Sequence, residues 1–520
     1  MTSPAFMLGF VPLALAGAAA LKQLGAPRAT VAWLVGASLL FCVWSDPRSL
    51  LPLTLSMLFN YAWGAALVRS GASRHALRKA LLVLGVAANL GLLACYKYGP
   101  PSFDVIAWLW GRSTRAASGE MPLGISFLTF LQVAFLADLY GGRTRLRGLA
   151  NYCLFVAFFP KLTAGPIVRH QQFADGASNL ASAQISPTQL AEGVTLIVIG
   201  LFKKLALADG LAPHANAVFA SAATGGSPSL VEAWGGVLAY TFQLYFDFSG
   251  YSDIAIGVAR LFGITLPWNF NSPYKAASIS DYWKRWHMTL SGFLRDYIYL
   301  PLGGKEKGTR RQYLNLWLTM TLCGLWHGGR WGFLAWGMLH GLFLVMNHAW
   351  RKRGFSCSAP VGWALTFLSA CLARVWFRAD DLETGVEVFR ALVGANGLVP
   401  AGATTGGLLK ALSICQPAAQ YATVAQVVSA LGGSFSLGRV TLHPAEILLS
   451  DVSLKLVYLA LAAFVAFALP NSQEFAGAAV GREGSPWSTR RAVGVALLAY
   501  LAMLASITNP EATAFVYRRF

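Results

Sequence analysis

Long apolar runs separated by short polar segments fill most of this 520-residue chain. Several approach the roughly 20 residues that an α-helix needs to cross the hydrocarbon core of a bilayer. With the weaker segments included, the pattern predicts an all-α, polytopic membrane helix bundle of roughly a dozen membrane elements, some of them re-entrant or interfacial. The clearest runs are residues 31–43, 50–68, 80–95, 190–207, 314–325, 331–345, 454–469 and 493–507.

The first apolar run, residues 6–21, is expected to be a retained span. No basic residue precedes it, and no clear small-residue cleavage site follows it, so the pattern does not fit a cleaved signal peptide. We predict one membrane domain over residues 1–520, with its motif-rich core at roughly 121–350. The longest stretch outside the membrane, roughly 380–443, should open with a short amphipathic helix and continue as a Gly/Ala/Thr-rich loop.

Charge is scarce and its placement indicates topology. Charged residues make up 12% of the chain, against about 25% in soluble proteins. The net charge of +19 comes from basic clusters between apolar runs, as the positive-inside rule produces, so nucleic acid binding is not needed to explain it. The clusters are Arg69/Arg74/Arg78/Lys79, Arg143/Arg145/Arg147, Lys305/Lys307/Arg310/Arg311 and Arg351/Lys352/Arg353.

Residues 278–300 do not resemble an ordinary membrane span. Ser278 and Asp281 fit a capping box, which predicts a helix start. Apolar residues recur at three- and four-residue spacing, but five charged residues share the segment, so an interfacial or re-entrant helix is expected, with His287 at the border of its two faces. The apolar stripe is Ile279, Trp283, Trp286, Leu290, Phe293 and Tyr297.

A pair of helices carries the second notable histidine. The first should run over residues 312–327 and end at Gly328-Gly329, and the second should run over 331–350. Basic clusters flank the outer ends of both, which should therefore face the cytoplasm. The turn at His327 then lies deep in the membrane, where irregular backbone must be buried in protein or line a cavity.

Imidazole is the natural base for acyl transfer near neutral pH, which makes His327 the leading catalytic candidate. On the residues alone, a structural histidine is an equal alternative. His287 is a candidate for assisting, although an interfacial histidine is the commoner case. Cys323, four residues before His327, leaves a Cys–His nucleophile pair open, but a packed cysteine is the commoner case. His340 and His348 are interpreted as structural.

The remaining ionisable residues are given structural interpretations first. No ligand spacing typical of metal sites appears, so no metal is expected. Lys305, Lys307, Arg310 and Arg311 are positive-inside charges that could also hold the phosphates of a nucleotide-bearing donor. Charges in or beside apolar runs should form interhelical ion pairs that fix the bundle. These are Asp138, Asp247, Asp253, Arg374 and Arg378.

An ordered series of motifs resembles the membrane-bound O-acyltransferase superfamily, and within it the bacterial alginate O-acetyltransferase branch. The series spans nearly the whole chain and is therefore far more specific than any single motif. It comprises MPLGIS (121–126), FFPKLTAGPIVR (158–169), GLFKK (200–204), YFDFSGYSD (245–253), the run 269–304, LWHG (325–328) and LPN (469–471).

The resemblance implies a multi-pass enzyme of the bacterial inner membrane with a central tunnel that meets at His327. It implies a cytoplasmic acyl donor, acetyl-CoA, with a carrier protein as the alternative. It makes His327 the essential histidine and His287 the second one. It also implies that a periplasmic SGNH-type acetyltransferase partner receives the acyl group and modifies alginate, another exopolysaccharide or a cell-wall glycan.

The carboxyl-terminal aromatic tail partly matches one in relatives where a tyrosine is suspected of relaying the acyl group. Tyr517 holds that position, but Arg518 and Arg519 replace residues that are usually uncharged. An interfacial aromatic and basic anchor is the alternative. For the whole chain, the rival from another class is a transporter or flippase for a polysaccharide precursor or lipid, which would be expected to show related halves with broken helices.

Overall fold

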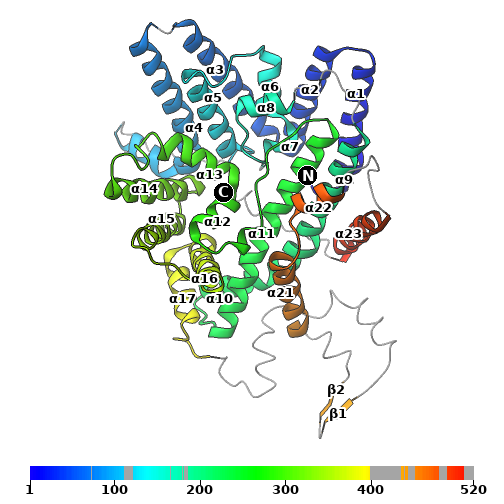
Figure 1. Cartoon of the computed structure of the whole chain (residues 1–520), viewed down its shortest axis with the longest axis vertical. Coiled ribbons are helices and arrows are strands. Elements are labelled where there is room, and N and C mark those ends of the chain that lie inside the picture. Colours follow the sequence, from blue (N-terminus) through cyan, green and yellow to red (C-terminus); the bar gives the residue numbers. More distant parts are fainter. Residues whose placement is uncertain are drawn as a thin grey trace.

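The structure is a computed structural model of a helix bundle (Figure 1). The residues that it describes are 1–71, 73–109, 121–163, 165–177, 180, 186–398, 435–437, 440–442, 451–479 and 489–508. The fold class predicted from the apolar pattern is confirmed: within these residues the secondary structure is helical except for one short antiparallel pair of strands.

The first half of the chain forms the upper part of the bundle in Figure 1, the long central helix and, at the lower end, α10. Its elements are η1 (Ala5–Phe10), α1 (Val11–Gln23), α2 (Pro27–Ser45), η2 (Pro47–Ser49), α3 (Leu50–Arg69), α4 (His75–Leu109), α5 (Ile125–Tyr140), α6 (Leu149–Ala157), α7 (Phe159–Leu162), α8 (His170–Gly176), α9 (Pro187–Leu201), η4 (Phe202–Ala208), α10 (Asp209–Ala223) and α11 (Leu230–Leu261).

The second half adds the helices that carry both candidate histidines. Its elements are η5 (Pro273–Lys275), α12 (Ile279–Arg285), α13 (Met288–Leu294), η6 (Arg295–Tyr299), α14 (Thr309–His327), α15 (Trp331–Lys352), α16 (Ala359–Arg378), α17 (Leu382–Leu392), β1 (Phe435–Leu437), β2 (Val440–Leu442), α21 (Asp451–Phe467), α22 (Ser472–Ala479) and α23 (Thr489–Thr508).

Length and apolarity alone identify fewer spans than the sequence pattern suggested. Five helices of the described chain are long and apolar enough to cross a membrane: Ala5–Gln23, Pro27–Ser45, Pro47–Arg69, His75–Tyr98 and Ala359–Arg378. Three apolar helices are shorter. Others, such as α11, carry charged residues that disqualify them as lipid-facing spans but suit the interior of a bundle.

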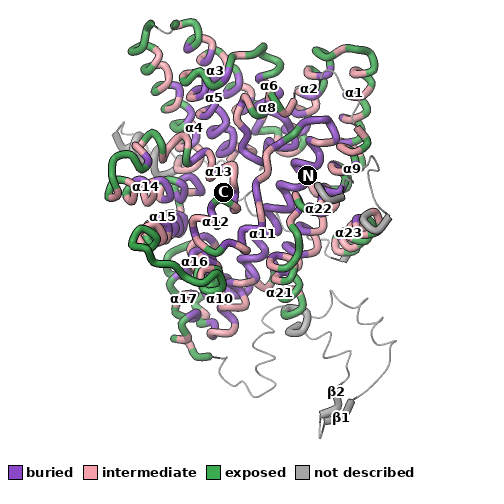
Figure 2. The backbone as a smooth tube through the Cα atoms, in the orientation of Figure 1, coloured by how far each residue is buried: buried purple, intermediate pink, exposed green. Residues whose placement is uncertain are grey.

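The central helix α11 is buried along nearly its whole length and packs against α9, η4, α10 and α16 (Figure 2). Glycines let α9 and α11 approach closely. A Cβ added at Gly200 would lie 2.5 Å from the carbonyl oxygen of Gly250, and one added at Gly193 would lie 2.9 Å from that of Gly257. Small residues at such crossings strengthen van der Waals packing between membrane helices.

Two interhelical ion pairs predicted from the sequence are confirmed at this interface. Lys203 on η4 lies 2.7 Å from Asp253 on α11, and Lys204 lies 2.8 Å from Asp247 and 2.7 Å from Asp209. All five side chains are buried. Each ammonium therefore offsets carboxylates that would otherwise be costly to hold away from water.

The other predicted ion pairs take different forms. Asp138 pairs with Arg143, just beyond its own helix, and accepts a hydrogen bond of 2.8 Å from the hydroxyl of Tyr297. Arg378 pairs with Asp380, two residues further along the chain, so the interhelical ion pair expected for Arg378 is wrong. It reaches another helix by donating to the Asn216 amide instead.

The stretch over residues 380–443 is partly as predicted. The amphipathic helix is confirmed as α17, with Val388, Ala391 and Leu392 buried. The loop expected after it contains the paired strands β1 and β2, joined in antiparallel register with Phe435 opposite Leu442. Alternation of apolar and polar residues in two such short runs was too brief a signal to predict them.

Replacing Lys204 with Met should destabilise the bundle strongly, because Asp209 and Asp247 would lose a buried counter-charge. Breaking a buried pair costs about 3–5 kcal/mol. Thermal unfolding in detergent should show a clearly lowered Tm, partly recovered when Asp247→Leu is added to Lys204→Met. Arg390→Met, which removes the exposed partner of Glu387, is the control and should change little. A Tm equal to that of the parent chain in Lys204→Met would contradict a structural role for this network.

Candidate active site

The hairpin of α14 and α15 positions His327 as the last residue of α14. The two helices touch through glycines: a Cβ added at Gly324 would lie 2.3 Å from the carbonyl oxygen of Phe333, and one added at Gly337 would lie 2.5 Å from that of Met320. At the opposite end of the hairpin, Lys352 contacts Thr309. With 19 residues, α14 carries His327 about 28 Å from the basic end.

The predicted boundaries of this hairpin are confirmed to within a few residues, and the side chain of His327 is enclosed. His327 is only 2% exposed. Its ring is perpendicular to that of Trp336, with centroids 5.0 Å apart, and lies 5.1 Å from the ring of Phe377 on α16. Charged or titratable groups that act on it electrostatically are Lys97 and Arg374, together with the second histidine, His287.

His287 lies at a break in the backbone rather than on a continuous helix. The single helix expected over residues 278–300 is wrong: α12 ends at Arg285, Trp286 is extended, and His287 has left-handed torsion angles (φ 42°, ψ 56°). The N-terminal start is confirmed, since the Ser278 hydroxyl accepts from the Asp281 backbone N–H. A left-handed non-glycine residue is costly, and such strain recurs at functional sites.

Residues preceding the helices hold this break in place. The backbone N–H of Met288 donates to the Asn269 carbonyl at 2.8 Å, and the N–H of Asn271 donates to the Arg285 carbonyl at 2.9 Å. An extended strand of chain thus satisfies backbone groups that the interrupted helix leaves open. These contacts compensate for the strain at His287 and determine where its side chain points.

A hydrogen-bond chain determines which nitrogen of His287 carries the proton. Its Nδ1 lies 3.0 Å from Oδ1 of Asn269, and the same oxygen accepts from the Thr289 hydroxyl at 2.8 Å. The Asn269 amide nitrogen donates to Ser252 at 3.2 Å, which fixes the orientation of the amide. Nδ1 must therefore be the donor, and Nε2 carries the lone pair. Nε2 is buried and has no hydrogen-bond partner among the described residues.

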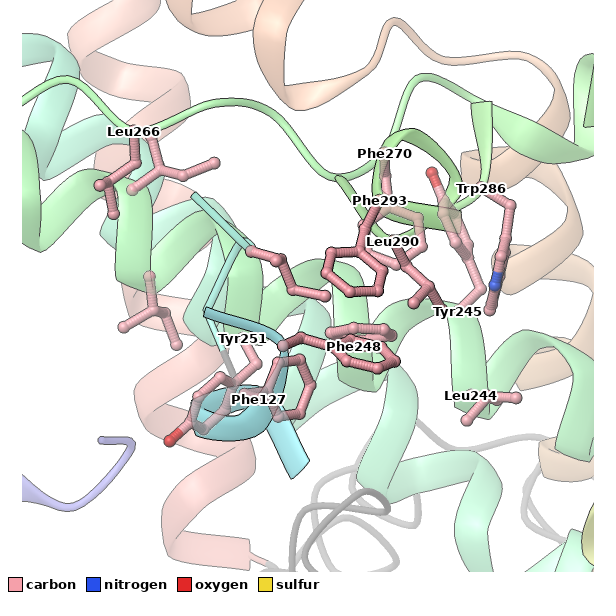
Figure 3. Close-up of a cluster of buried hydrophobic side chains, with 14 of the residues drawn as sticks. Phe127, Leu244, Tyr245, Phe248, Tyr251, Leu266, Phe270, Trp286, Leu290 and Phe293 are labelled. Carbon is pink, nitrogen blue, oxygen red and sulfur yellow. The ribbon is translucent and has the colours of Figure 1, made fainter. Parts of the chain in front are cut away.

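Aromatic rings separate and enclose the two imidazoles. Phe248 is perpendicular to His287 at 4.7 Å, and Phe127 lies 6.4 Å from His287 on another side. Phe127 in turn contacts Trp326, the neighbour of His327, at 5.7 Å. Figure 3 shows Phe127 and Phe248 converging with other rings from different segments. His287 is fully buried, not at the border of two helix faces as expected.

The other predicted site residues do not join this cluster. Lys305, Lys307, Arg310 and Arg311 are exposed at the basic end of α14, the far end of the helix from His327. Cys323 is fully buried, one turn before His327 on the same helix. Tyr517 lies outside the described residues. In the part of the chain that the structure describes, no group of three His, Cys, Asp or Glu residues could hold a metal ion.

The two histidines expected to be structural lie on α15. The ring of His340 is buried and its Nδ1 lies 3.3 Å from the indole nitrogen of Trp283. His348 is half-buried further along the same helix. The ring of His340 packs among Tyr282, Trp283 and Trp336, and the structural interpretation of both histidines stays a prediction.

Sequence reasoning missed several residues that shape the site. Asn269 carried a signal, since it opens the same motif run as His287. Lys97 carried another, as a lone cation at the end of an apolar run. Trp336 and Phe377, which pack on His327, carried none, because apolar and aromatic residues are ordinary in a membrane helix.

Comparison with known proteins decides the family. A profile described as MBOAT, membrane-bound O-acyltransferase family, matches residues 122–355. A peptidoglycan O-acetyltransferase of Helicobacter pylori is 38% identical, over 76% of this chain and 80% of the relative. The chain belongs to the membrane-bound O-acyltransferase family. A probable alginate O-acetylase AlgI of Azotobacter vinelandii is 37% identical, over 75% of this chain and 77% of the relative.

The family membership confirms the resemblance drawn from the motifs. This membrane-bound O-acyltransferase is a multi-pass membrane enzyme, so the alternative of a transporter without acyl-transfer chemistry is set aside. A more distant relative, a teichoic acid D-alanyltransferase of Streptococcus thermophilus, is 32% identical over 44% of this chain and 58% of the relative. Both histidines lie inside the matched range, and their roles stay predictions.

Replacing Asn269 with Ala should lower acyl transfer by roughly 10-fold or more, because the acceptor that selects the His287 tautomer is lost. Asn269→Asp keeps an acceptor for Nδ1–H and should retain more activity. The matched control is Asn89→Ala, which breaks a buried asparagine pair with Asn60 between α3 and α4. Acetyl-group turnover and Tm are measured for each. Wild-type turnover in Asn269→Ala would show that this tautomer does not matter.

Proposed function

We propose that this enzyme transfers an acetyl group from cytoplasmic acetyl-CoA across the bacterial inner membrane, through a tunnel that meets at His327, for O-acetylation of a cell-surface glycan. Alginate, another exopolysaccharide and peptidoglycan are the acceptor classes. A periplasmic SGNH-type transferase completes the reaction. The observation that carries the proposal is that two buried imidazoles, from separate parts of the chain, flank one pair of contacting rings: His287 lies 6.4 Å from Phe127, and His327 lies 4.7 Å from Trp326.

The arrangement fits base-assisted acyl transfer. His327 accepts the proton of the acceptor hydroxyl as its oxygen adds to the thioester carbonyl. The tetrahedral intermediate collapses, the carbon–sulfur bond breaks, and the imidazolium returns the proton to the leaving thiolate. His287 can accept a hydrogen bond at Nε2 and so orient the acceptor. Burial among aromatic rings excludes water that would hydrolyse the thioester.

The basic end of α14 supports the proposed donor side. Lys305, Lys307, Arg310 and Arg311 are exposed, and none forms an ion pair among the residues that the structure describes. They are therefore open to the phosphates of a nucleotide-bearing donor. Because basic loops face the cytoplasm, the same end would meet acetyl-CoA. His327 at the other end of α14 would then act where the acyl group passes to its acceptor on the way outward.

Two arguments support the proposed acceptor and partner: the names of the relatives, and the size and polarity of a glycan chain. Relatives more than 35% identical are named for O-acetylation of peptidoglycan and alginate. A glycan chain is large and polar, and hydroxyl-rich chains are excluded from hydrocarbon. The acyl group must therefore leave the bilayer to meet it, which requires a partner at the outer mouth of the tunnel. Tyr517 is retained as a proposed relay residue of that last step.

His327→Ala should lower acetyl-CoA turnover by about 10²–10⁴-fold, the usual contribution of a general base. The purified chain in lipid nanodiscs is supplied with acetyl-CoA, the periplasmic transferase and glycan, and release of free thiol is followed. His348→Ala, on the adjacent helix, is the control and should keep wild-type turnover. Equal turnover in His327→Ala and the parent chain, with both correctly inserted, would refute the role of His327.

Polymer acetylation should require a second protein. Nanodiscs carrying the purified chain, acetyl-CoA and glycan should give acetylated polymer only when a periplasmic transferase encoded beside this chain is added. The reason is that the polymer does not reach His327 inside the bundle. Mass spectrometry of the glycan provides the measurement. Efficient glycan acetylation by the chain alone would replace the relay with a self-contained transferase.

A further inference from the structure

Two consecutive side chains at the end of the α4 span hold the C-terminus of α14. The ammonium of Lys97 contacts the backbone carbonyl oxygen of Trp326. The hydroxyl of Tyr98 contacts the backbone carbonyl oxygen of Leu325. The last carbonyls of a helix have no partner within the helix and need donors from elsewhere. These contacts fix the turn in which His327 follows directly after Trp326.

Lys97 also brings charge to this turn. Its ammonium lies 5.2 Å from the centre of the Trp326 ring, and it acts electrostatically on both His327 and Cys323. Among the described residues, no carboxylate forms an ion pair with it. A cation within a membrane helix is expensive, and one without an acidic partner is a functional candidate.

The charged and titratable groups around His327 come from several helices. Lys97 approaches from α4, Arg374 from α16 and His287 from the break between α12 and α13, while Cys323 lies on α14 itself. Positive charge disfavours a proton on the imidazole and favours negative charge on a reacting oxygen. The first effect leaves the imidazole free to accept a proton before the reaction, and the second favours the oxyanion of the acyl-transfer step.

We propose that Lys97 is a positioning residue for acyl transfer, which clamps the end of α14 and places its positive charge beside the turn that carries His327. The inference rests on the proposed function. In the step it supports, the acceptor O–H bond breaks and its proton passes to His327. As the new carbon–oxygen bond forms, the thioester carbonyl becomes an oxyanion. The carbon–sulfur bond then breaks, and the proton moves from His327 to the thiolate.

The test compares Lys97→Met and Lys97→Arg with Lys22→Met in the full chain. Lys22 is the matched control, because its ammonium lies 3.4 Å from the carbonyl oxygen of Phe262 at the end of α11, far along the chain from either histidine. Each variant in nanodiscs is supplied with acetyl-CoA, the periplasmic transferase and glycan, and kcat, KM and the pH dependence of thiol release are measured. Tm is recorded for every variant.

Lys97→Met is expected to lower kcat on the order of 10²-fold with little change in KM. The acidic limb of its pH–rate profile should move to higher pH by about one unit, because the His327 imidazole is protonated more easily without the cation. Lys97→Arg keeps the charge and should keep the position of the limb. Lys22→Met should match the parent chain in kcat, KM and the pH dependence of thiol release.

Two results would overturn the proposal. One is a parent-like kcat and pH profile in Lys97→Met. The other is a lowered kcat whose acidic limb is unmoved and which Lys97→Arg shares, since both variants would then report structure alone. Failure of the proposed function is distinguished separately: the parent chain would then release no more thiol from acetyl-CoA than His327→Ala does.

Discussion

A polar group placed in hydrocarbon must find its partner inside the protein, and this requirement organises the whole bundle. Lys203 and Lys204 neutralise carboxylates on α11, which lets a helix with charged residues occupy the centre. Side chains from α4 cap the carbonyls that end α14. The extended chain at Asn269 satisfies the break before α13. Each site element is therefore held by a contact that the membrane makes expensive to break.

Close helix packing is the second condition for the site. Glycines at the α14–α15 contact bring the two backbones together, so the His327 ring is enclosed by rings from α15 and α16. A side chain in place of Gly324 would meet the Phe333 backbone and push the hairpin apart. Since packed interiors do not deform continuously, such a change would move His327 away from its neighbours without touching it.

The parts of the structure that follow local rules were predictable from the sequence. The apolar runs located most long helices, and the Gly328-Gly329 pair correctly ended α14. The start of α12 at Ser278 also follows a local rule. The break at His287 was not predictable, because local propensity favours a continuous helix through residues 278–300. Backbone contacts from Asn269 and Asn271, distant in the sequence, override that propensity.

The same distinction explains the candidate site. Motifs identified both histidines, but only the fold shows how differently the two are held. Asn269 fixes the proton of His287 on Nδ1, so Nε2 is left as the nitrogen that can accept a hydrogen bond. The group that fixes it is a neutral amide. His327 lies instead among groups of positive or neutral charge, including Lys97 and Arg374. A neutral acceptor suits the orientation of a hydroxyl, and nearby positive charge leaves the other imidazole unprotonated before the reaction begins. Two histidines of one chain can therefore divide orientation and proton transfer between them, which gives a physical reason for both to be present.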